Sequence, residues 1–203
     1  MKTDIWKICS LVSSVLVIAI SIMFFQQRTA RSSNNKSLHS SINYMDTLMH
    51  YSINFNLNND IGCIQLNNIN CHSEDSILSL SDLVKNKPIL VYRYANISCD
   101  GCVKIILKDL DNIFDKQVND VLILCSYSTK KEYNYFRKMN NIRLPMYNID
   151  TNALNDQVNS IDSPYFFILY PNLTASNFYI PDIRFAELNE KYHMGAKSLI
   201  SEY

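Results

Sequence analysis

The stretch that decides the fold runs from residue 89 to residue 103 and reads Ile89-Leu-Val-Tyr-Arg-Tyr-Ala-Asn-Ile-Ser-Cys99-Asp-Gly-Cys102-Val103. Its first part, Ile89 to Tyr94, is rich in β-branched and aromatic residues and is predicted to be a central strand of a sheet. Two cysteines separated by two residues follow this strand. Apolar residues then recur at steps of three and four, which predicts an amphipathic helix that begins at the cysteine pair. These apolar residues are Val103, Ile106, Leu107, Leu110 and Phe114.

The spacing of Cys99 and Cys102 suits thiol–disulfide chemistry. Two intervening residues at the start of a helix let the sulfur atoms reach a bonding distance of about 2 Å. Unpaired amides at the positive end of the helix dipole stabilise a thiolate and lower its pKa. We therefore predict that Cys99 attacks a disulfide and that Cys102 resolves the mixed disulfide.

Other interpretations of the pair remain open. The pair could be a structural disulfide without turnover, or the domain could be a binding module that performs no chemistry. Copper(I) or zinc could also be held by the two thiolates, but zinc needs further ligands. The sequence has no second closely spaced cysteine pair and no histidine pair with metal-ligand spacing. We predict neither a metal site nor a cofactor.

The remaining apolar segments predict an α/β fold with a mixed central sheet and flanking helices. Thr129 and Glu132 have the spacing of a capping box, which predicts a helix start. Asp182 is predicted to cap the last helix. Residues 53–57 alternate apolar residues with asparagine and predict a half-buried strand. The other expected strands cover residues 63–66, 89–94, 121–125, 145–149, 165–170 and 177–180, and a one-turn helix is expected at 81–83.

The N-terminus carries an uncharged apolar run over residues 8–25. As a helix, these residues would extend about 27 Å, close to the hydrocarbon thickness of a bilayer. We predict a single transmembrane signal anchor at 8–25, after a tail at 1–7 and before a polar linker at 26–50. The folded domain is expected at 51–203, with its core at 74–203. A cleaved signal peptide is the competing interpretation.

The charge composition limits the kinds of partner, and three further cysteines lie in the predicted domain. Lysine plus arginine and aspartate plus glutamate both number 19, so charge provides no reason to expect nucleic acid. We predict a structural disulfide between Cys63 and Cys71; the alternatives are two independent thiols or exchange with the Cys99–Cys102 pair. Cys125 ends an apolar strand and is predicted to be a buried, inert thiol.

Several of these segments together resemble a known family. The run from Glu74 to Tyr92, followed by Ser98-Cys-Asp-Gly-Cys102, is similar to the thioredoxin-like redoxins of bacterial cell envelopes. The strand Leu144-Pro-Met-Tyr147 and the dipeptide Ser163-Pro164 match the same pattern, so the resemblance covers about residues 74–203.

The resemblance implies a thioredoxin-like fold and exchange with cysteine-containing protein substrates. A thiol or disulfide electron-transfer partner is implied as well. The expected location is the inner (cytoplasmic) membrane, as a single-pass protein whose domain faces the periplasm or the outside. Ser163 and Pro164 are expected to bind substrate backbone opposite the dithiol, with the Ser163–Pro164 bond in the cis form.

The chain departs from the family at positions that matter for redox chemistry. Ser98 stands where many relatives carry tryptophan, and Asp100-Gly101 stands in place of Gly-Pro. Arg93 occupies the strand position, six before Cys99, where thioredoxins hold a buried acid. An arginine cannot act as a base, although it could favour a thiolate while Asp100 opposes one. The proline and threonine that precede a peroxidatic cysteine are missing, which disfavours peroxidase activity.

Overall fold

The computed structural model describes residues 23–24, 40–95, 100–115 and 117–203. The chain divides into two compact units, Met1–His50 and Tyr51–Tyr203. In the first unit the described residues, 23–24 and 40–50, are helical. The polar linker predicted at 26–50 is helical over residues 40–50, which include good helix formers such as Met45 and Leu48.

The predicted anchor at 8–25 lies outside the described residues apart from Met23 and Phe24. Within the described part of the chain, no helix has both the length and the apolar character needed to cross a bilayer.

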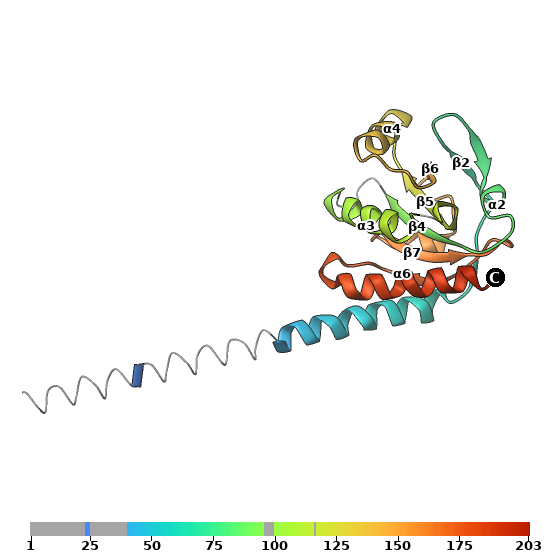
Figure 1. Ribbon diagram of the computed structural model, residues 1–203. Coiled ribbons are helices and arrows are strands. Elements are labelled where there is room, and N and C mark those ends of the chain that lie inside the picture. Colours follow the sequence, from blue (N-terminus) through green and yellow to red (C-terminus); the bar gives the residue numbers. More distant parts are fainter. Residues whose placement is uncertain (1–22, 25–39, 96–99, 116) are drawn as a thin grey trace, which may run out of the picture. The chain divides into compact units, whose positions relative to one another are not determined.

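The second unit is built on an eight-stranded mixed sheet with the order β1-β8-β7-β4-β5-β6-β2-β3 (Figure 1). Strands β4, β5 and β6 are parallel, while β7, β8 and β1 continue one side of the sheet with antiparallel pairing. Antiparallel β2 and β3 complete the other side. The strands are β1 Ile64–Gln65, β2 Asn70–His72, β3 Ile77–Ser79, β4 Ile89–Ala95, β5 Val121–Ser126, β6 Met146–Asn148, β7 Tyr165–Leu169 and β8 Thr174–Tyr179.

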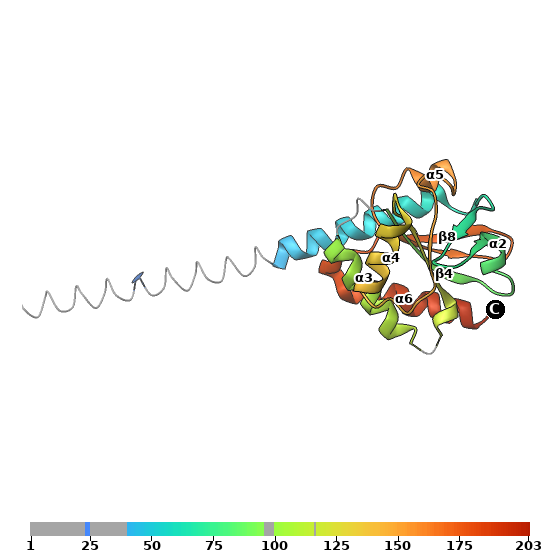
Figure 2. The same cartoon turned by 90° about the horizontal axis from the view of Figure 1, so that it is seen from above.

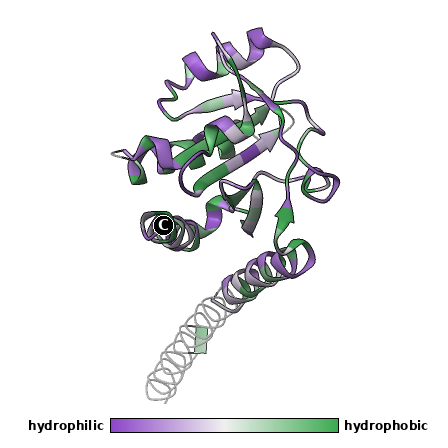
Figure 3. Ribbon diagram, turned by 90° about the vertical axis from the view of Figure 1, so that its right-hand side faces the viewer, coloured by the Kyte–Doolittle hydropathy of each residue, from purple (hydrophilic) through white to green (hydrophobic). Residues whose placement is uncertain are grey.

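Helices cover both faces of the sheet (Figures 1 and 2), so the central strand β4 is buried on both sides. One face carries α3 (Asp100–Ile113), α4 (Lys130–Met139) and α6 (Ala186–Ser201), which pack on Leu90, Tyr92 and Tyr94. The other face carries α2 (Leu80–Leu83), α5 (Asp156–Asn159) and apolar side chains of helical residues 51–61. Two 3₁₀ turns complete the fold, η1 (Val118–Asp120) and η2 (Ile183–Phe185). Hydropathy follows this layering: the central strands are mostly hydrophobic and α4 is largely hydrophilic (Figure 3).

The predicted α/β fold with a mixed sheet and flanking helices is confirmed, and it is thioredoxin-like. Strand β4 leads into α3, α3 returns to parallel β5, and the β7–β8 hairpin is followed by α6. The capping box is also confirmed, since Thr129 Oγ1 accepts from the Glu132 amide and Glu132 accepts from the Thr129 amide. Asp182 caps η2, directly before α6.

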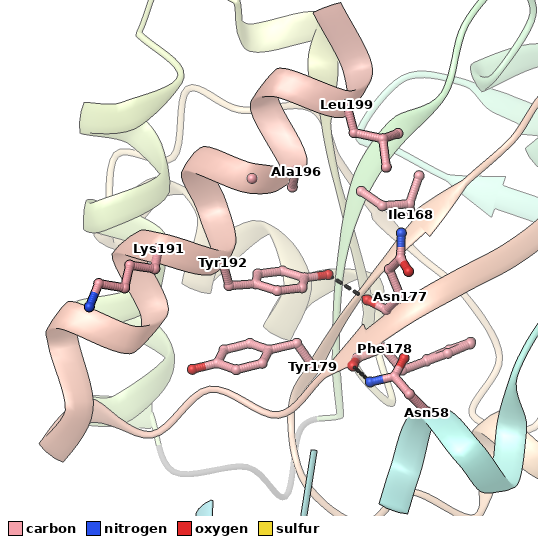
Figure 4. A pocket seen from close by; sticks show the side chains of 10 residues that line it. Asn58, Ile168, Asn177, Phe178, Tyr179, Lys191, Tyr192, Ala196 and Leu199 are labelled. Atoms are coloured by element: carbon pink, nitrogen blue, oxygen red, sulfur yellow. Dashed lines mark hydrogen bonds between the residues drawn. The ribbon is translucent and has the colours of Figure 1, made fainter. Parts of the chain in front are cut away.

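The strand predicted at 53–57 is wrong, because residues 51–61 are helical. Asn54 and Asn58 lie one helical turn apart, and both side chains bond the backbone of the chain around the end of β8. Asn54 Oδ1 accepts from the Ile180 amide at 2.6 Å. Asn58 Nδ2 donates to the Phe178 carbonyl at 2.5 Å, as Figure 4 shows. The helix ends at Gly62, whose φ of 60° suits glycine and whose amide bonds the Asn58 carbonyl. The strand expected near residues 63–66 is present as β1.

Candidate functional site

The described half of the cysteine pair lies where the sequence predicts it. β4 ends at Ala95, α3 begins at Asp100, and Cys102 is a partly exposed residue in the first turn of α3. Val103 and Ile106 are buried beneath this turn, 1% and 2% exposed, so they fix the start of α3 against the sheet. Cys99 lies outside the described residues.

Strand register brings Ser163 and Pro164 to the same end of the sheet as Cys102. β7 runs antiparallel to β4 with Tyr165 opposite Arg93, so the residues before β7 lie beside the carboxyl end of β4. Ser163, Arg93 and Ala95 line one small cavity of about 120 Å³. The expected cis form of the Ser163–Pro164 bond is wrong: the bond is trans. The trans form of an X–Pro bond is intrinsically lower in free energy, by about 0.5–1 kcal/mol.

Arg93 is a buried cation next to this cavity, 5% exposed. Its guanidinium donates to the Tyr94 carbonyl, to Ser126 Oγ at 2.7 Å and to the Thr151 carbonyl at 3.3 Å. Burial lowers the pKa of Arg93 from its ordinary value, because desolvation disfavours the charged form. These acceptors are uncharged, so the site keeps a positive charge at the position where the resemblance implies an acid.

The opposite face of β4 carries Tyr92, a residue that no sequence motif singles out. Tyr92 is fully buried, and its ring stacks on Phe166 with centroids 4.6 Å apart. Its hydroxyl has no hydrogen-bond partner in the described part of the chain. Burial raises the pKa of Tyr92, and the charge of a Cys102 thiolate raises it further. No motif marks a tyrosine whose hydroxyl is left unpaired.

His193 of α6 is a second buried group of this kind, 1% exposed. Its ring meets Phe166 edge-on with centroids 4.8 Å apart, and neither ring nitrogen has a hydrogen-bond partner among the described residues. Burial lowers the pKa of His193 from 6.5 to about 4. The imidazole is therefore neutral near pH 7.

The structural disulfide considered for Cys63 and Cys71 is absent, since both residues are free thiols. Cys63 is exposed directly before β1, whereas Cys71 is buried in β2, and these strands lie near opposite edges of the sheet. Burial raises the pKa of Cys71 to about 12. Cys125 is buried in β5, as predicted, and burial raises its pKa as well.

A larger cavity of about 340 Å³ lies between β8 and α6 (Figure 4). The rings of Tyr179 and Tyr192 stack beside it at 4.4 Å, and the Tyr192 hydroxyl donates to the Asn177 carbonyl. Its lining is mostly apolar and holds no thiol.

Comparisons with known proteins find structural neighbours only. No family model and no curated relative matches the sequence. Solved structures with a thioredoxin-like fold do match, and they include thiol–disulfide oxidoreductases and peroxiredoxins.

Three of these structures illustrate the kinds of protein that match and the degree of similarity. A putative thiol–disulfide oxidoreductase from Bacteroides vulgatus is 18% identical with a TM-score of 0.46, over 61% of this chain and 84% of that one. A secreted disulfide oxidoreductase from Mycobacterium tuberculosis is 11% identical with a TM-score of 0.46, over 62% and 94%. A mitochondrial 2-Cys peroxiredoxin from Plasmodium falciparum is 13% identical with a TM-score of 0.48, over 66% and 90%. At such low similarity, function has to be argued from the residues of this chain.

Proposed function

We propose that this chain catalyses thiol–disulfide exchange through Cys99 and Cys102. The observation that carries the proposal is the position of Cys102 in the first turn of α3, directly after the central strand β4. A helix start favours a thiolate through its unpaired amides and dipole. The register of β4 and β7 adds Ser163 and Pro164 at the same end of the sheet, where a substrate chain would approach.

The exchange needs no component besides the dithiol and a substrate disulfide. The Cys99 thiolate attacks one substrate sulfur, a Cys99–substrate disulfide forms, and the other substrate sulfur leaves as a thiolate and takes a proton. Cys102 then loses its proton and attacks Cys99. The Cys99–Cys102 bond forms while the second substrate sulfur leaves and is protonated. The substrate gains two electrons and the enzyme pair loses two; the reverse sequence oxidises a substrate dithiol.

The substrates we propose are proteins that carry cysteines, with a second thiol or disulfide partner that resets the pair. The loop that ends in Ser163 and Pro164 would bind the substrate backbone beside the dithiol. Arg93 adds a buried positive charge to the cavity that Ser163 lines.

We further propose an anchor at residues 8–25 in the inner (cytoplasmic) membrane, with the domain in the periplasm or outside. The support is the length of the uncharged apolar run. The exposed thiol of Cys63 provides a test. A membrane-impermeant maleimide applied to intact spheroplasts should label Cys63, and labelling only after lysis would contradict the proposed orientation.

The exchange reaction is tested with the purified full-length chain in mild detergent, using reduction of insulin disulfides by dithiothreitol as the assay. Replacing Cys99 with serine or alanine should abolish catalysis. Cys102→Ser should instead accumulate a Cys99–substrate mixed disulfide, visible by mass spectrometry, because the resolving thiol is missing. Cys63→Ser is the matched control, since it removes a thiol that lies directly before β1, and should leave the rate unchanged.

Full activity in Cys99→Ala would refute the assignment. The direction of exchange follows from the equilibrium potential of the pair measured against glutathione or dithiothreitol. A potential of about −270 mV would indicate a reductant, and a potential of about −120 mV would indicate an oxidant.

A further inference from the structure

Tyr92 and His193, which both contact the Phe166 ring, are buried side chains with no hydrogen-bond partner for any of their polar atoms in the described part of the chain. Tyr92 is fully buried, and an unpaired buried hydroxyl is unfavourable unless some state of the protein provides an acceptor. Such a group beside a reactive centre is therefore worth testing for a role in the chemistry.

The Tyr92 ring is held on the face of the sheet that α3 covers. The ring stacks on Phe166 and lies in the same buried cluster as Val103 and Ile106, which belong to the first turns of α3. Cys102 precedes Val103 and is the titratable side chain of α3 that acts electrostatically on Tyr92. A Cys102 thiolate would therefore form close to a donor that has no other partner among the described residues.

We propose that the Tyr92 hydroxyl donates a hydrogen bond to Cys102 Sγ whenever that sulfur is a thiolate. This inference rests on the proposed function and adds a residue to the same site. In the structure as described, the hydroxyl is not hydrogen-bonded, so the contact forms when Cys102 loses its proton and its side chain turns toward the core. Hydrogen bonds at reactive centres commonly tighten only during the reaction.

The hydrogen bond would act in the resolving step. The Cys102 thiolate attacks Cys99 in the mixed disulfide, the Cys99–Cys102 bond forms, and the bond from Cys99 to the substrate breaks. The electron pair of that bond leaves with the substrate sulfur, which takes a proton from water. Tyr92 retains its own proton throughout, because burial raises its pKa. Tyr92 thus stabilises the attacking thiolate and is not consumed.

Neither of the other unusual polar groups can replace Tyr92. Arg93 follows Tyr92 in β4, so its side chain lies on the opposite face of the sheet and bonds Ser126 and Thr151 there. His193 contacts the Phe166 ring, which also packs against Tyr92. The charge of Cys102 contributes to the raised pKa of Tyr92, whereas the pKa of His193 is lowered by burial alone.

The test uses Tyr92→Phe, which removes one oxygen and keeps the stacked ring. Tyr94→Phe is the matched control, because Tyr94 lies on the same strand and face but its hydroxyl pairs with Tyr127 at 3.4 Å. Both changes are made in full-length Cys99→Ser protein, and alkylation of Cys102 by iodoacetamide is followed across pH by peptide-resolved mass spectrometry. Loss of a charge-assisted hydrogen bond should move the alkylation midpoint of Cys102 up by about one pH unit in Tyr92→Phe. Tyr94→Phe should leave the midpoint unchanged.

A second measurement uses protein with both cysteines. In Tyr92→Phe, release of substrate from the Cys99 mixed disulfide near pH 7 should slow by about tenfold, in proportion to the smaller thiolate fraction. If exchange proceeds normally and the alkylation midpoints of the Tyr92→Phe and Tyr94→Phe variants coincide, the role of Tyr92 is refuted while the proposed function stands. If the parent protein shows no exchange at all, the proposed function fails first.

Discussion

Acid should destabilise this protein through His193, and the size of the effect follows from its burial. The imidazole is 1% exposed, its nitrogens have no hydrogen-bond partners among the described residues, and its pKa is lowered from 6.5 to about 4. An unfolded chain binds a proton near pH 6.5, whereas the folded chain binds it only near pH 4. Between these values the unfolded state holds more protons, so stability is complete above about pH 6.5 and is lost as pH falls.

The magnitude follows from proton linkage with these two pKa values. Between pH 7 and pH 5, His193 alone should reduce the free energy of unfolding by about 2 kcal/mol, and the loss approaches about 3.4 kcal/mol below pH 4. For a domain of this size, about 2 kcal/mol corresponds to a fall in Tm of about 4–8 °C. No correction for solvent screening applies, because the ring is buried.

The assay is urea unfolding of wild type and His193→Leu at several pH values from 7.5 to 5. The replacement keeps an apolar side chain of similar size against Phe166 and Tyr192 but cannot titrate. Its stability at pH 7.5 can differ from wild type, so the quantity that matters is the change with pH. Contributions from exposed carboxylates and from the other histidines are common to both proteins and cancel in the comparison. Parallel curves for the two proteins would refute the reasoning, and a wild-type curve steeper by about 2 kcal/mol at pH 5 would support it.

Two further predictions concern stability alone. Thr129→Ala removes the capping box of α4 and should lower the free energy of unfolding by about 1 kcal/mol, whereas exposed Ser128→Ala should change it little; chemical denaturation compares the two. Asn54→Ala leaves the Ile180 amide without its 2.6 Å acceptor and should cost about 1–3 kcal/mol, with faster hydrogen exchange of that amide. Unchanged exchange at Ile180 would show that the side chain of Asn54 does not protect the end of β8.

Local patterns predicted the centre of the fold well, because there the burial and the periodicity agree. Ile89 to Ala95 is buried along almost its whole length, and a strand buried on both faces has a continuous apolar sequence. The helix after Cys102 shows a stripe of apolar residues that corresponds to its buried face. The capping box could be predicted from two residues because its hydrogen bonds are local.

Features that depend on distant partners could not be predicted in this way. Residues 53–57 alternate in polarity, yet they form a helix because Asn54 and Asn58 bond the chain at Phe178 and Ile180, more than 100 positions away. Cys63 and Cys71 are close in sequence but belong to opposite sides of the sheet, since β1 pairs with β8 and β2 pairs with β6. Only the strand order reveals that these thiols do not meet.

The candidate site likewise has one part that depends on local sequence and one part that depends on distant residues. The cysteine spacing and the strand–helix junction are local, so Cys102 could be placed from sequence at the start of α3. Whether a buried tyrosine has a hydrogen-bond partner depends on every element that packs around it, so Tyr92 could be recognised only in the folded chain.

Adjacent residues of β4 give the proposed site its electrostatic character. Because side chains alternate along a strand, Tyr92 faces α3 and Arg93 faces the opposite layer. One residue supplies an uncharged donor on the side of Cys102, and the other supplies a fixed positive charge near Ser163. In the proposed site the Tyr92 donor favours a thiolate at Cys102, and neither Tyr92 nor Arg93 can accept a proton as a buried acid would. In the proposed reaction, neither of these two residues can therefore remove the proton of Cys102.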